Sequence, residues 1–258
     1  MAQDINALAQ KIHTAIETHQ TITPLSSDPG GISLAQAYEV ANGLRSLQGR
    51  QRVGFKVGFT NRAIWEVYGV NRPIWGVVSA ETLTPPTAPV KLVTAFQPRI
   101  EPEIVLGLSK TPEQGMDRAA LAGCIDWVAP GFEIVQTIYP DWKMDIIDSV
   151  AAQALHVNLV VGEMVPATPE VLEGLTDIPV DLMRGDEVVE TGVGANALDG
   201  PLDVLAHLVD MLDPDQAVQA GELVSTGTLT DAWRIEPGEE WTGRYGGVMG
   251  KSLNVRFE

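Results

Sequence analysis

The stretch Arg99–Leu108, RIEPEIVLGL, sets two carboxylates one residue apart in a segment that is otherwise apolar and β-branched. Alternate side chains of an extended strand lie on one face, so we expect Glu101 and Glu103 side by side. Two like charges at that spacing raise each other's pKa unless a cation or hydrogen-bond donors lie between them. Taken alone, the stretch is more typical of an edge strand with a solvated acidic face, which Pro102 permits because proline removes a ladder donor.

The composition limits the classes of protein to which the chain can belong. A chain of 258 residues can bury a substantial core. It has 17 Lys and Arg against 34 Asp and Glu, a formal net charge of −17, so its surface should repel nucleic acid. Cys124 is the single cysteine, and no apolar run resembles a signal peptide or reaches the roughly 20 residues of a membrane helix. We expect a cytoplasmic protein with neither nucleic-acid nor membrane partners.

Helical patterns come first along the chain. Apolar residues at helical spacing in residues 5–16 predict one helix. A second helix is expected from Ser33, which forms a capping-box pattern with Gln36, to about Gly49. These patterns predict an N-terminal helical part at residues 1–50.

Residues 51–258 contain mostly short β-like runs separated by turn residues. Two helical patterns interrupt the runs, at residues 116–128 and 200–212. The order predicts an α+β fold, with a β-rich catalytic body that forms one structural unit with the helical part.

Two further residues have ionisable side chains within otherwise apolar segments. Glu133 is a lone carboxylate in GFEIVQTIY, and Lys56 lies between apolar residues in VGFKVGFT. Three carboxylates without clustered His or Cys would suit Mg²⁺ or Mn²⁺ rather than zinc. A partly buried lysine can act as an acid or base or hold a substrate carboxylate. Taken alone, Glu133 is better interpreted as a surface acid at the start of a strand. For Lys56, a lysine whose stem is buried and whose head reaches water is an equally open interpretation.

Hydroxyl groups gather in LVSTGTLTD, residues 223–231. Backbone N–H groups there, with Thr226 or Thr228, could bind a carboxylate, and an ordinary polar turn explains the stretch equally well. His156 stands alone in an apolar segment, a position more typical of a hydrogen-bonded core residue than of a catalyst. No phosphate-loop or dinucleotide-binding pattern occurs in the required context, so nucleotide cofactors lack support.

Five stretches, read together, closely resemble the 2-oxopent-4-enoate hydratase and 4-oxalocrotonate decarboxylase family of the fumarylacetoacetate hydrolase superfamily. They are VGFKVGFTN, YGVNRPIWGVV, QPRIEPEIVLGL, WVAPGFEIVQTIYPDWKMDIIDSVA and LVSTGTL, and the resemblance runs in order from about Ala35 to the C-terminus. It implies a mixed β-roll with N-terminal helices and a homo-oligomer. It also implies that Glu101, Glu103 and Glu133 bind Mg²⁺ or Mn²⁺ and that Lys56 lines the active site.

The resemblance implies a metal-dependent lyase of aromatic-compound degradation. The enzyme would add water to a 2-hydroxydienoate (2-oxo-4-enoate) to give a 4-hydroxy-2-oxo acid, with the metal stabilising the enolate. Lys56 would move the proton or anchor the carboxylate, and Thr226 and Gly227 would help to bind the substrate. The alternatives are decarboxylation of a 4-oxalocrotonate-like 2-oxo diacid, carbon–carbon hydrolysis of an acylpyruvate-like substrate, and a non-catalytic homologue.

Two segments depart from the family pattern. PIWG carries Ile74 where hydratases commonly have an acid, and Glu81 in the following SAETL is the nearest replacement. AAQAL, residues 151–155, stands where ADNAS is common, and His156 follows it. The superfamily's hydrolases often activate water with a Glu-His pair, so His156 joins Lys56 and Glu81 as a candidate catalytic residue. These departures keep the decarboxylase and hydrolase alternatives open.

Overall fold

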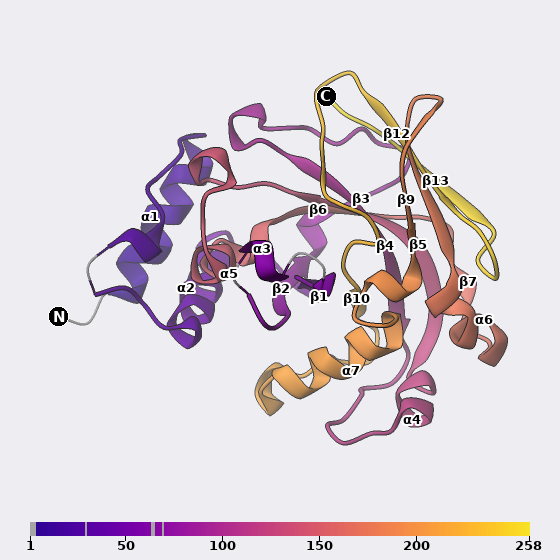
Figure 1. The fold of residues 1–258 in the computed structure, drawn as a ribbon. Helices are drawn as coiled ribbons and strands as arrows, with labels where there is room; N and C mark the ends of the chain where they lie inside the picture. Colours follow the sequence, from indigo (N-terminus) through magenta and orange to yellow (C-terminus); the bar gives the residue numbers. More distant parts are fainter. Residues whose placement is uncertain (1–3, 29, 63–64, 69) are drawn as a thin grey trace.

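The fold places a pair of N-terminal helices beside a strand-rich body that curls on itself (Figure 1). It is given by a computed structural model that describes residues 4–28, 30–62, 65–68 and 70–258. The predicted α+β class, with a mixed sheet and an N-terminal helical part, is confirmed. Among the described residues, none of the helices is long and apolar enough to cross a membrane.

Both predicted N-terminal helices are present. Helix α1 spans Ile5–Glu17, and helix α2 spans Leu34–Leu47 and begins with the capping box of Ser33 and Gln36. Their apolar faces pack on each other and on the short helix α5, Ile146–Ala151. This buried cluster also contains residues of the strand-rich body, and the division at residue 50 stays a prediction.

The larger sheet has the strand order β2-β1-β10-β4-β5-β6-β3, with β11 paired to β4 and β7 paired to β5. Most neighbours are antiparallel, whereas β1 with β10 and β3 with β6 are parallel. Its strands are β1 Arg52–Gly58, β2 Ile74–Ser79, β3 Leu83–Thr84, β4 Arg99–Leu108, β5 Ile125–Val135, β6 His156–Val161, β7 Val165–Pro166, β10 Leu223–Ser225 and β11 Trp233–Arg234.

A second, four-stranded antiparallel sheet has the order β13-β12-β8-β9. Its strands are β8 Pro179–Arg184, β9 Glu187–Val193, β12 Glu240–Tyr245 and β13 Lys251–Arg256. Phe132 of β5 and Trp241 of β12 belong to one buried cluster that joins the two sheets. Helices α3 Trp65–Tyr68, α4 Arg118–Ala122, α6 Pro169–Gly174 and α7 Pro201–Met211 complete the fold. Helix α7 confirms the pattern at residues 200–212.

The helix predicted at residues 116–128 is wrong over its second half. Helix α4 ends at Ala122, and strand β5 begins at Ile125. Residues of β5 pair with β4 on one side and with β6 and β7 on the other. The ring of Trp127 fits over Gly107, where an added Cβ would lie 1.9 Å from Trp127 Cε2. Strand pairing and this close approach outweigh the local helical period.

Candidate metal and substrate site

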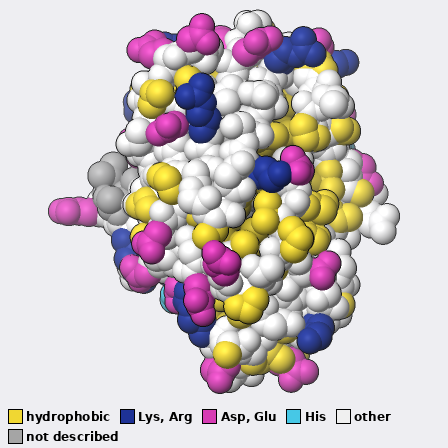
Figure 2. All heavy atoms as spheres, turned by 90° about the vertical axis from the view of Figure 1, so that its right-hand side faces the viewer, with side chains coloured by type: hydrophobic (Ala, Val, Ile, Leu, Met, Phe, Trp, Pro, Cys, Tyr) yellow, Lys and Arg dark blue, Asp and Glu magenta, His cyan; other side chains and the backbone are white. Residues whose placement is uncertain are grey.

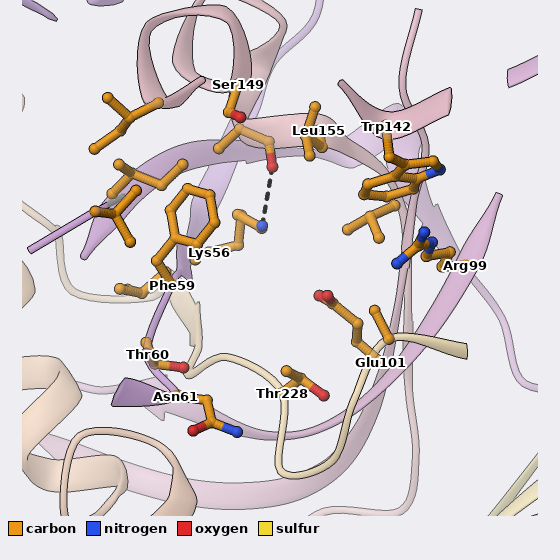
Figure 3. Close-up of a pocket in the computed structure, with 18 of the residues that line it drawn as sticks. Lys56, Phe59, Thr60, Asn61, Arg99, Glu101, Trp142, Ser149, Leu155 and Thr228 are labelled. Atoms are coloured by element: carbon orange, nitrogen blue, oxygen red, sulfur yellow. Dashed lines mark hydrogen bonds between the residues drawn. The ribbon is translucent and has the colours of Figure 1, made fainter. Parts of the chain in front are cut away.

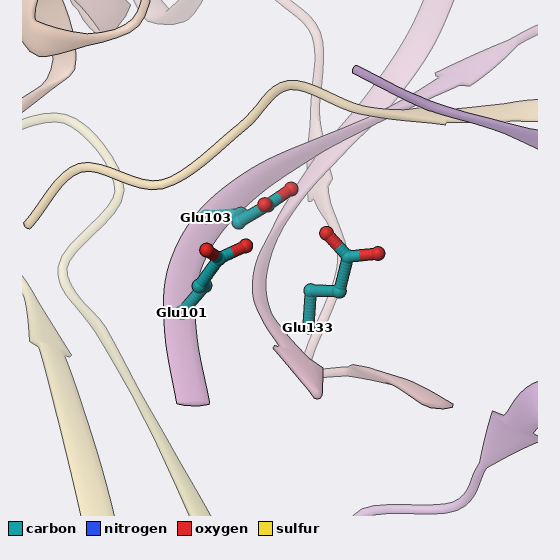
Figure 4. A group of neighbouring side chains, drawn as sticks. All are labelled: Glu101, Glu103 and Glu133. Atoms are coloured by element: carbon teal, nitrogen blue, oxygen red, sulfur yellow. The ribbon is translucent and has the colours of Figure 1, made fainter. Parts of the chain in front are cut away.

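Three carboxylates meet on one face of the larger sheet. Glu101 of β4 lies directly opposite Glu133 of the antiparallel strand β5. Glu103, two residues further along β4, points to the same face because side chains of a strand alternate. One oxygen of each carboxylate lies within 4.8 Å of the others (Figure 4). Glu103 and Glu133 are fully buried, whereas Glu101 is partly exposed.

Each buried carboxylate is held by named donors. Ser225 Oγ and the backbone N–H of Gly227, at 3.0 Å, both donate to Glu103 Oε2. Glu133 Oε1 lies 2.8 Å from His156 Nδ1, and Glu133 Oε2 lies 3.0 Å from Lys56 Nζ. Among the described residues, Glu103 Oε1 has no hydrogen-bond partner.

The cluster is electrostatically strained without a further cation. Burial raises the pKa of Glu101 to about 7, even though the Lys56 charge lowers it. Burial and the charges of Glu133 and Glu101 raise the pKa of Glu103 well above its ordinary value. Burial also opposes ionisation of Glu133, but Lys56 and His156 outweigh it and lower the pKa of Glu133. Lys56 therefore compensates Glu133, and the other two carboxylates share too little positive charge.

Lys56 is buried at the centre of strand β1. Burial would lower the pKa of Lys56, but the surrounding carboxylates raise it, Glu133 most of all. Its Nζ also donates to the carbonyl oxygen of Ala154 at 3.0 Å (Figure 3). That carbonyl lies within residues 153–155, which all have positive φ of 52° to 66°. Such a run is strained for residues other than glycine, and strain of this kind is concentrated at functional sites.

A cavity of about 390 Å³ opens beside the cluster. Figure 3 shows Lys56 and Glu101 facing into it, with Arg99 and Trp142 on one side and Thr228 at another. Its described lining residues also include Val57, Gly58, Phe59, Thr60, Asn61, Val70, Ile74, Val135, Met144, Asp145, Ile146, Ser149, Ala154, Leu155, Thr230, Asp231 and Ala232. The space suits a small substrate that reaches Lys56 and Glu101 together.

His156 lies outside this lining, in contact with Glu133. One ring nitrogen contacts Glu133 Oε1, and the other lies 2.9 Å from Thr82 Oγ1. The side chain is almost completely buried. The geometry suits a residue that orients Glu133, and it leaves no ring nitrogen directed at the cavity.

Three other predicted site residues have different surroundings. The hydroxyl of Thr226 donates to the carbonyl oxygen of Ile104 at 2.8 Å, so it supports the strand rather than facing the cavity. Gly227, with φ +91°, has no room for a Cβ, which would lie 1.9 Å from Thr60 Oγ1. Glu81 is exposed and accepts from the backbone N–H of Gln51 at 3.1 Å. None of the three lines the cavity as described, and the roles assigned to them stay predictions.

Sequence reasoning named Trp142 as a candidate for a pocket wall or an interface, and Trp142 does line the cavity, but it did not single out Arg99 or Thr60. Arg99 follows the same alternation as Glu101 and Glu103, so the strand period alone would have placed it on their face. For Thr60 the signal is tertiary, because its segment reaches the cavity only through the folding of the chain.

The carboxylates fit a hard divalent cation. The donor set is all oxygen, and Glu103 carries a buried carboxylate oxygen with no partner in the described part of the chain. Buried polar atoms are costly to leave unsatisfied, and a divalent ion would both satisfy this oxygen and relieve the repulsion. Glu101, Glu103 and Glu133 are therefore the residues that could hold Mg²⁺ or Mn²⁺.

Comparisons with known proteins show which family the chain is similar to. Residues 56–249 match the family described as fumarylacetoacetate (FAA) hydrolase C-terminal. The chain is 29% identical to a 4-oxalocrotonate decarboxylase of Pseudomonas putida, covering 99% of this chain and 97% of that protein. It is 30% identical to a 2-keto-4-pentenoate hydratase of Paraburkholderia xenovorans (strain LB400), covering 97% and 93%.

A solved structure shares the whole fold. The 4-oxalocrotonate decarboxylase of Pseudomonas putida G7, complexed with magnesium and adipate, superposes with a TM-score of 0.89 at 30% identity. The match covers 98% of this chain and 97% of that one. The fold predicted from the resemblance is thereby confirmed over nearly the full length.

Proposed function

Because the chain belongs to the fumarylacetoacetate hydrolase family, we propose that it is a divalent-metal-dependent lyase for a short 2-oxo or 2-hydroxydienoic acid. The observation that carries the proposal is the cluster of Glu101, Glu103 and Glu133 beside the cavity, with Lys56 Nζ 3.0 Å from Glu133. The relatives named above are hydratases and decarboxylases, which both act on acids of this kind.

The three carboxylates would hold Mg²⁺ or Mn²⁺. When bound, such an ion supplies a positive charge that stabilises an enolate developing on the substrate. The decarboxylase of Pseudomonas putida G7 binds magnesium in its solved structure, which supports the same choice here.

Lys56 is the proposed catalytic residue. Its Nζ reaches the cavity while Glu133 and the Ala154 carbonyl hold it in place. The surrounding carboxylates keep it protonated, so it can donate a hydrogen bond to a substrate oxygen or give a proton to the developing carbanion. His156 acts indirectly by orienting Glu133.

Hydration is the first candidate reaction. Water adds to the conjugated double bond of the 2-oxo-4-enoate, and a 4-hydroxy-2-oxo acid forms. A hydratase must orient this water, and the cavity lining offers polar side chains for that purpose, such as those of Asp145, Thr228 and Thr230.

Decarboxylation of a 2-oxo diacid is the second candidate, and the apolar residues of the cavity lining favour it. Ile74, Val57, Val135 and Leu155 are apolar members of the described lining, and Ile74 stands where hydratases of the family commonly carry an acid. Glu81 is exposed, accepts from the backbone N–H of Gln51 and is not among the described lining residues. Apolar lining residues would exclude water from the enolate that forms when the C–C bond to the departing carbon dioxide breaks.

The hydrolytic and non-catalytic alternatives have weaker support. Both ring nitrogens of His156 are engaged, one by Glu133 and one by Thr82, so His156 is not placed to activate water. A drifted, non-catalytic pocket would not need to keep three buried or half-buried carboxylates, which are costly without an ion.

Turnover assays test the proposal. Purified protein with Mg²⁺ or Mn²⁺ should convert members of a panel of 2-hydroxydienoates and 2-oxo acids, and EDTA should abolish the conversion. Release of carbon dioxide identifies decarboxylation, and a 4-hydroxy-2-oxo product identifies hydration. Absence of metal binding and of turnover across the panel would reject the lyase. Two acid products from one acylpyruvate would instead establish the hydrolase.

A homo-oligomer in the cytoplasm is the remaining part of the proposal. Figure 2, which views the molecule from the side of α4, α6 and β13, shows hydrophobic side chains gathered across the middle of this face. A hollow of about 630 Å³ lies between α4, α6 and α7, lined largely by apolar residues such as Ala122, Ile125 and Leu172. A second copy would cover this surface, and sedimentation of the purified protein tests this assembly. A strictly monomeric protein at micromolar concentration would contradict it.

A further inference from the structure

A short left-handed turn lines the cavity beside Lys56. Its residues Gln153, Ala154 and Leu155 have φ of 58°, 52° and 66°, a conformation that is strained for residues with a side chain. The carbonyl oxygen of Ala154, the middle residue, accepts from Lys56 Nζ at 3.0 Å (Figure 3). The conformation of this turn therefore sets the position of one acceptor for the proposed catalytic residue.

The turn lies close against the strand next to Lys56. Gly76 of β2 pairs directly with Lys56 of β1. A Cβ at Gly76 would lie 2.8 Å from the carbonyl oxygen of Gln153 and 3.0 Å from the Cβ of Ala154, so this position has no space for a side chain. Glycine here lets the turn approach β2 until the Ala154 carbonyl reaches Lys56.

Both ends of the turn are tied to neighbouring segments. At its second end, the carbonyl oxygen of Leu155 accepts from the backbone N–H of Gln136 at 3.0 Å. At its first end, the side chain of Gln153 donates through Nε2 to Oε1 of Gln48 at 3.0 Å. Gln48 is the C-cap residue of α2, so this bond joins the N-terminal helices to the cavity lining. Glutamine does not favour a left-handed backbone by itself, so contacts of this kind must impose the conformation.

We propose that Gln48 and Gln153 are positioning residues, which hold the left-handed turn so that the Ala154 carbonyl fixes Lys56 in the cavity. Neither glutamine is among the described lining residues, so the effect of the pair on the chemistry passes through Lys56. Without the pair, Lys56 keeps its contact with Glu133 and loses the second contact that fixes the direction of its ammonium group. The inference rests on the proposed lyase function for its effect on turnover, and it gives helix α2 a part in the site.

The first test reads the environment of Lys56 and needs no turnover. Metal-free protein is treated briefly with acetic anhydride, and mass spectrometry compares acetylation of Lys56 with that of Lys91, an exposed lysine that serves as internal reference. Gln48→Ala removes the amide that holds Gln153. In this variant the ratio of Lys56 to Lys91 acetylation should rise about fivefold, as expected for the loss of one neutral hydrogen bond.

Two further variants separate a loosened turn from a general effect. Gln10→Ala is the matched control, because Gln10 is an exposed glutamine on α1 whose amide donates to Thr14 within the same helix. It should keep the wild-type acetylation ratio within about twofold. The double variant with Gln48→Ala and Gln153→Asn should return to within about twofold of wild type, because asparagine adopts a left-handed backbone more readily than glutamine.

Kinetics provide the second readout. With a 2-oxo acid or 2-hydroxydienoate that the wild type converts, Gln48→Ala should lower kcat about fivefold or more and change KM by less than about twofold. A proton donor displaced by about 1 Å loses much of its effect in the transition state, and an interaction made only there affects kcat rather than KM. Adding Gln153→Asn should restore kcat. The Kd for Mg²⁺ should stay within about twofold of wild type throughout, because His156 still holds Glu133.

The outcomes are distinguishable. An unchanged acetylation ratio in Gln48→Ala overturns the proposal, and so does a raised ratio that Gln153→Asn does not reverse, because partial unfolding would produce that result. An unchanged kcat in Gln48→Ala, measured against an active wild type, also overturns it. A wild type that neither binds Mg²⁺ nor converts any acid of the panel would instead reject the lyase, and the acetylation ratio would still decide whether the two glutamines hold Lys56.

Discussion

Replacing Glu103 by glutamine removes one negative charge from the carboxylate cluster while preserving the shape of the side chain. In the metal-free protein the amide oxygen can still accept from Ser225 and Gly227, as Glu103 Oε2 does now. The new NH₂ group takes the place of Glu103 Oε1, which has no partner among the described residues, and can donate to Glu101 or Glu133. Without metal, the variant should be at least as stable as wild type.

The magnitude follows from the distances. The cluster's oxygens lie within 4.8 Å of one another, and two unit charges at that distance repel by ~3.5 kcal/mol at an effective dielectric constant of about 20. Part of this repulsion is already relieved by protonation, since the pKa values of Glu101 and Glu103 are raised. We therefore expect the metal-free variant to gain about 1 kcal/mol or less in unfolding free energy.

Although the substitution should not destabilise the metal-free protein, it should weaken the binding of Mg²⁺. At a Mg²⁺ concentration about 100 times the wild-type Kd, binding stabilises the fold by about 2.7 kcal/mol. Loss of a charged ligand should raise the Kd for Mg²⁺ about 100-fold or more. Even the loss of a residue that only hydrogen-bonds to a metal ligand typically lowers metal affinity by about 10-fold to 100-fold. The variant then gains only about 0.4 kcal/mol at the same concentration. For a chain of this length, the Mg²⁺-induced rise in Tm should fall from about 5–10 °C to about 1 °C.

The assay is thermal unfolding of wild type and Glu103→Gln, each with EDTA and with Mg²⁺. Glu187→Gln serves as a matched control, because Glu187 is an exposed acid at the start of β9. It should keep the full Mg²⁺-induced rise in Tm. A Glu103→Gln protein that keeps this rise as well would refute the metal site, and one that is strongly destabilised in EDTA would refute the reasoning about repulsion.

Three further outcomes are expected. Lys56→Met should lower kcat by about a hundredfold or more while the circular dichroism spectrum stays native, as expected when a proton donor is lost; unchanged kcat would remove Lys56 from the chemistry. His156→Gln should weaken Mg²⁺ binding by about 10-fold to 100-fold, and turnover should recover at high Mg²⁺, whereas a loss that saturating Mg²⁺ does not restore would identify a direct role. The pKa of Glu101 is raised to about 7 and that of Glu103 is also raised, so Mg²⁺ must displace protons when it binds. The Kd for Mg²⁺ should therefore decrease as the pH rises from about 6 to about 8. Calorimetry in buffers of different ionisation enthalpy measures that proton release, and a pH-independent Kd would contradict the shifted pKa values.

The fold was predictable where local patterns agree with tertiary pairing. The capping box at Ser33 and the apolar stripes of α1 and α7 are local signals, and all three helices form as expected. The pattern at residues 116–128 is equally local, but there the pairing of β5 with its neighbours decides. Periodicity describes one segment at a time and carries no information about which strand will pair with it.

The same limit applies to the site residues. A lone histidine and a hydroxyl-rich turn both offered polar groups, and their direction could not be read from residue type. In the structure His156 contacts Glu133, Thr226 bonds to the backbone of β4, and Thr228 lines the cavity. Orientation depends on the partner strand and on the left-handed turn of residues 153–155, which no short pattern specifies.

The sequence by itself determined that Glu101 and Glu103 share a face, because the period of a strand is two residues. Its resemblance to a known family also identified Glu133 and Lys56 as their partners. Only the tertiary structure decided how the four residues meet. The register of β4 against β5 sets Glu133 opposite Glu101, and strand β1 brings Lys56 to Glu133. The tertiary structure also directs the side chain of Arg99 into the cavity, where its charge is unpaired among the described residues. Buried like charges tolerate one another only in a particular three-dimensional arrangement of counter-charges, and that arrangement is set by contacts between segments distant in the chain.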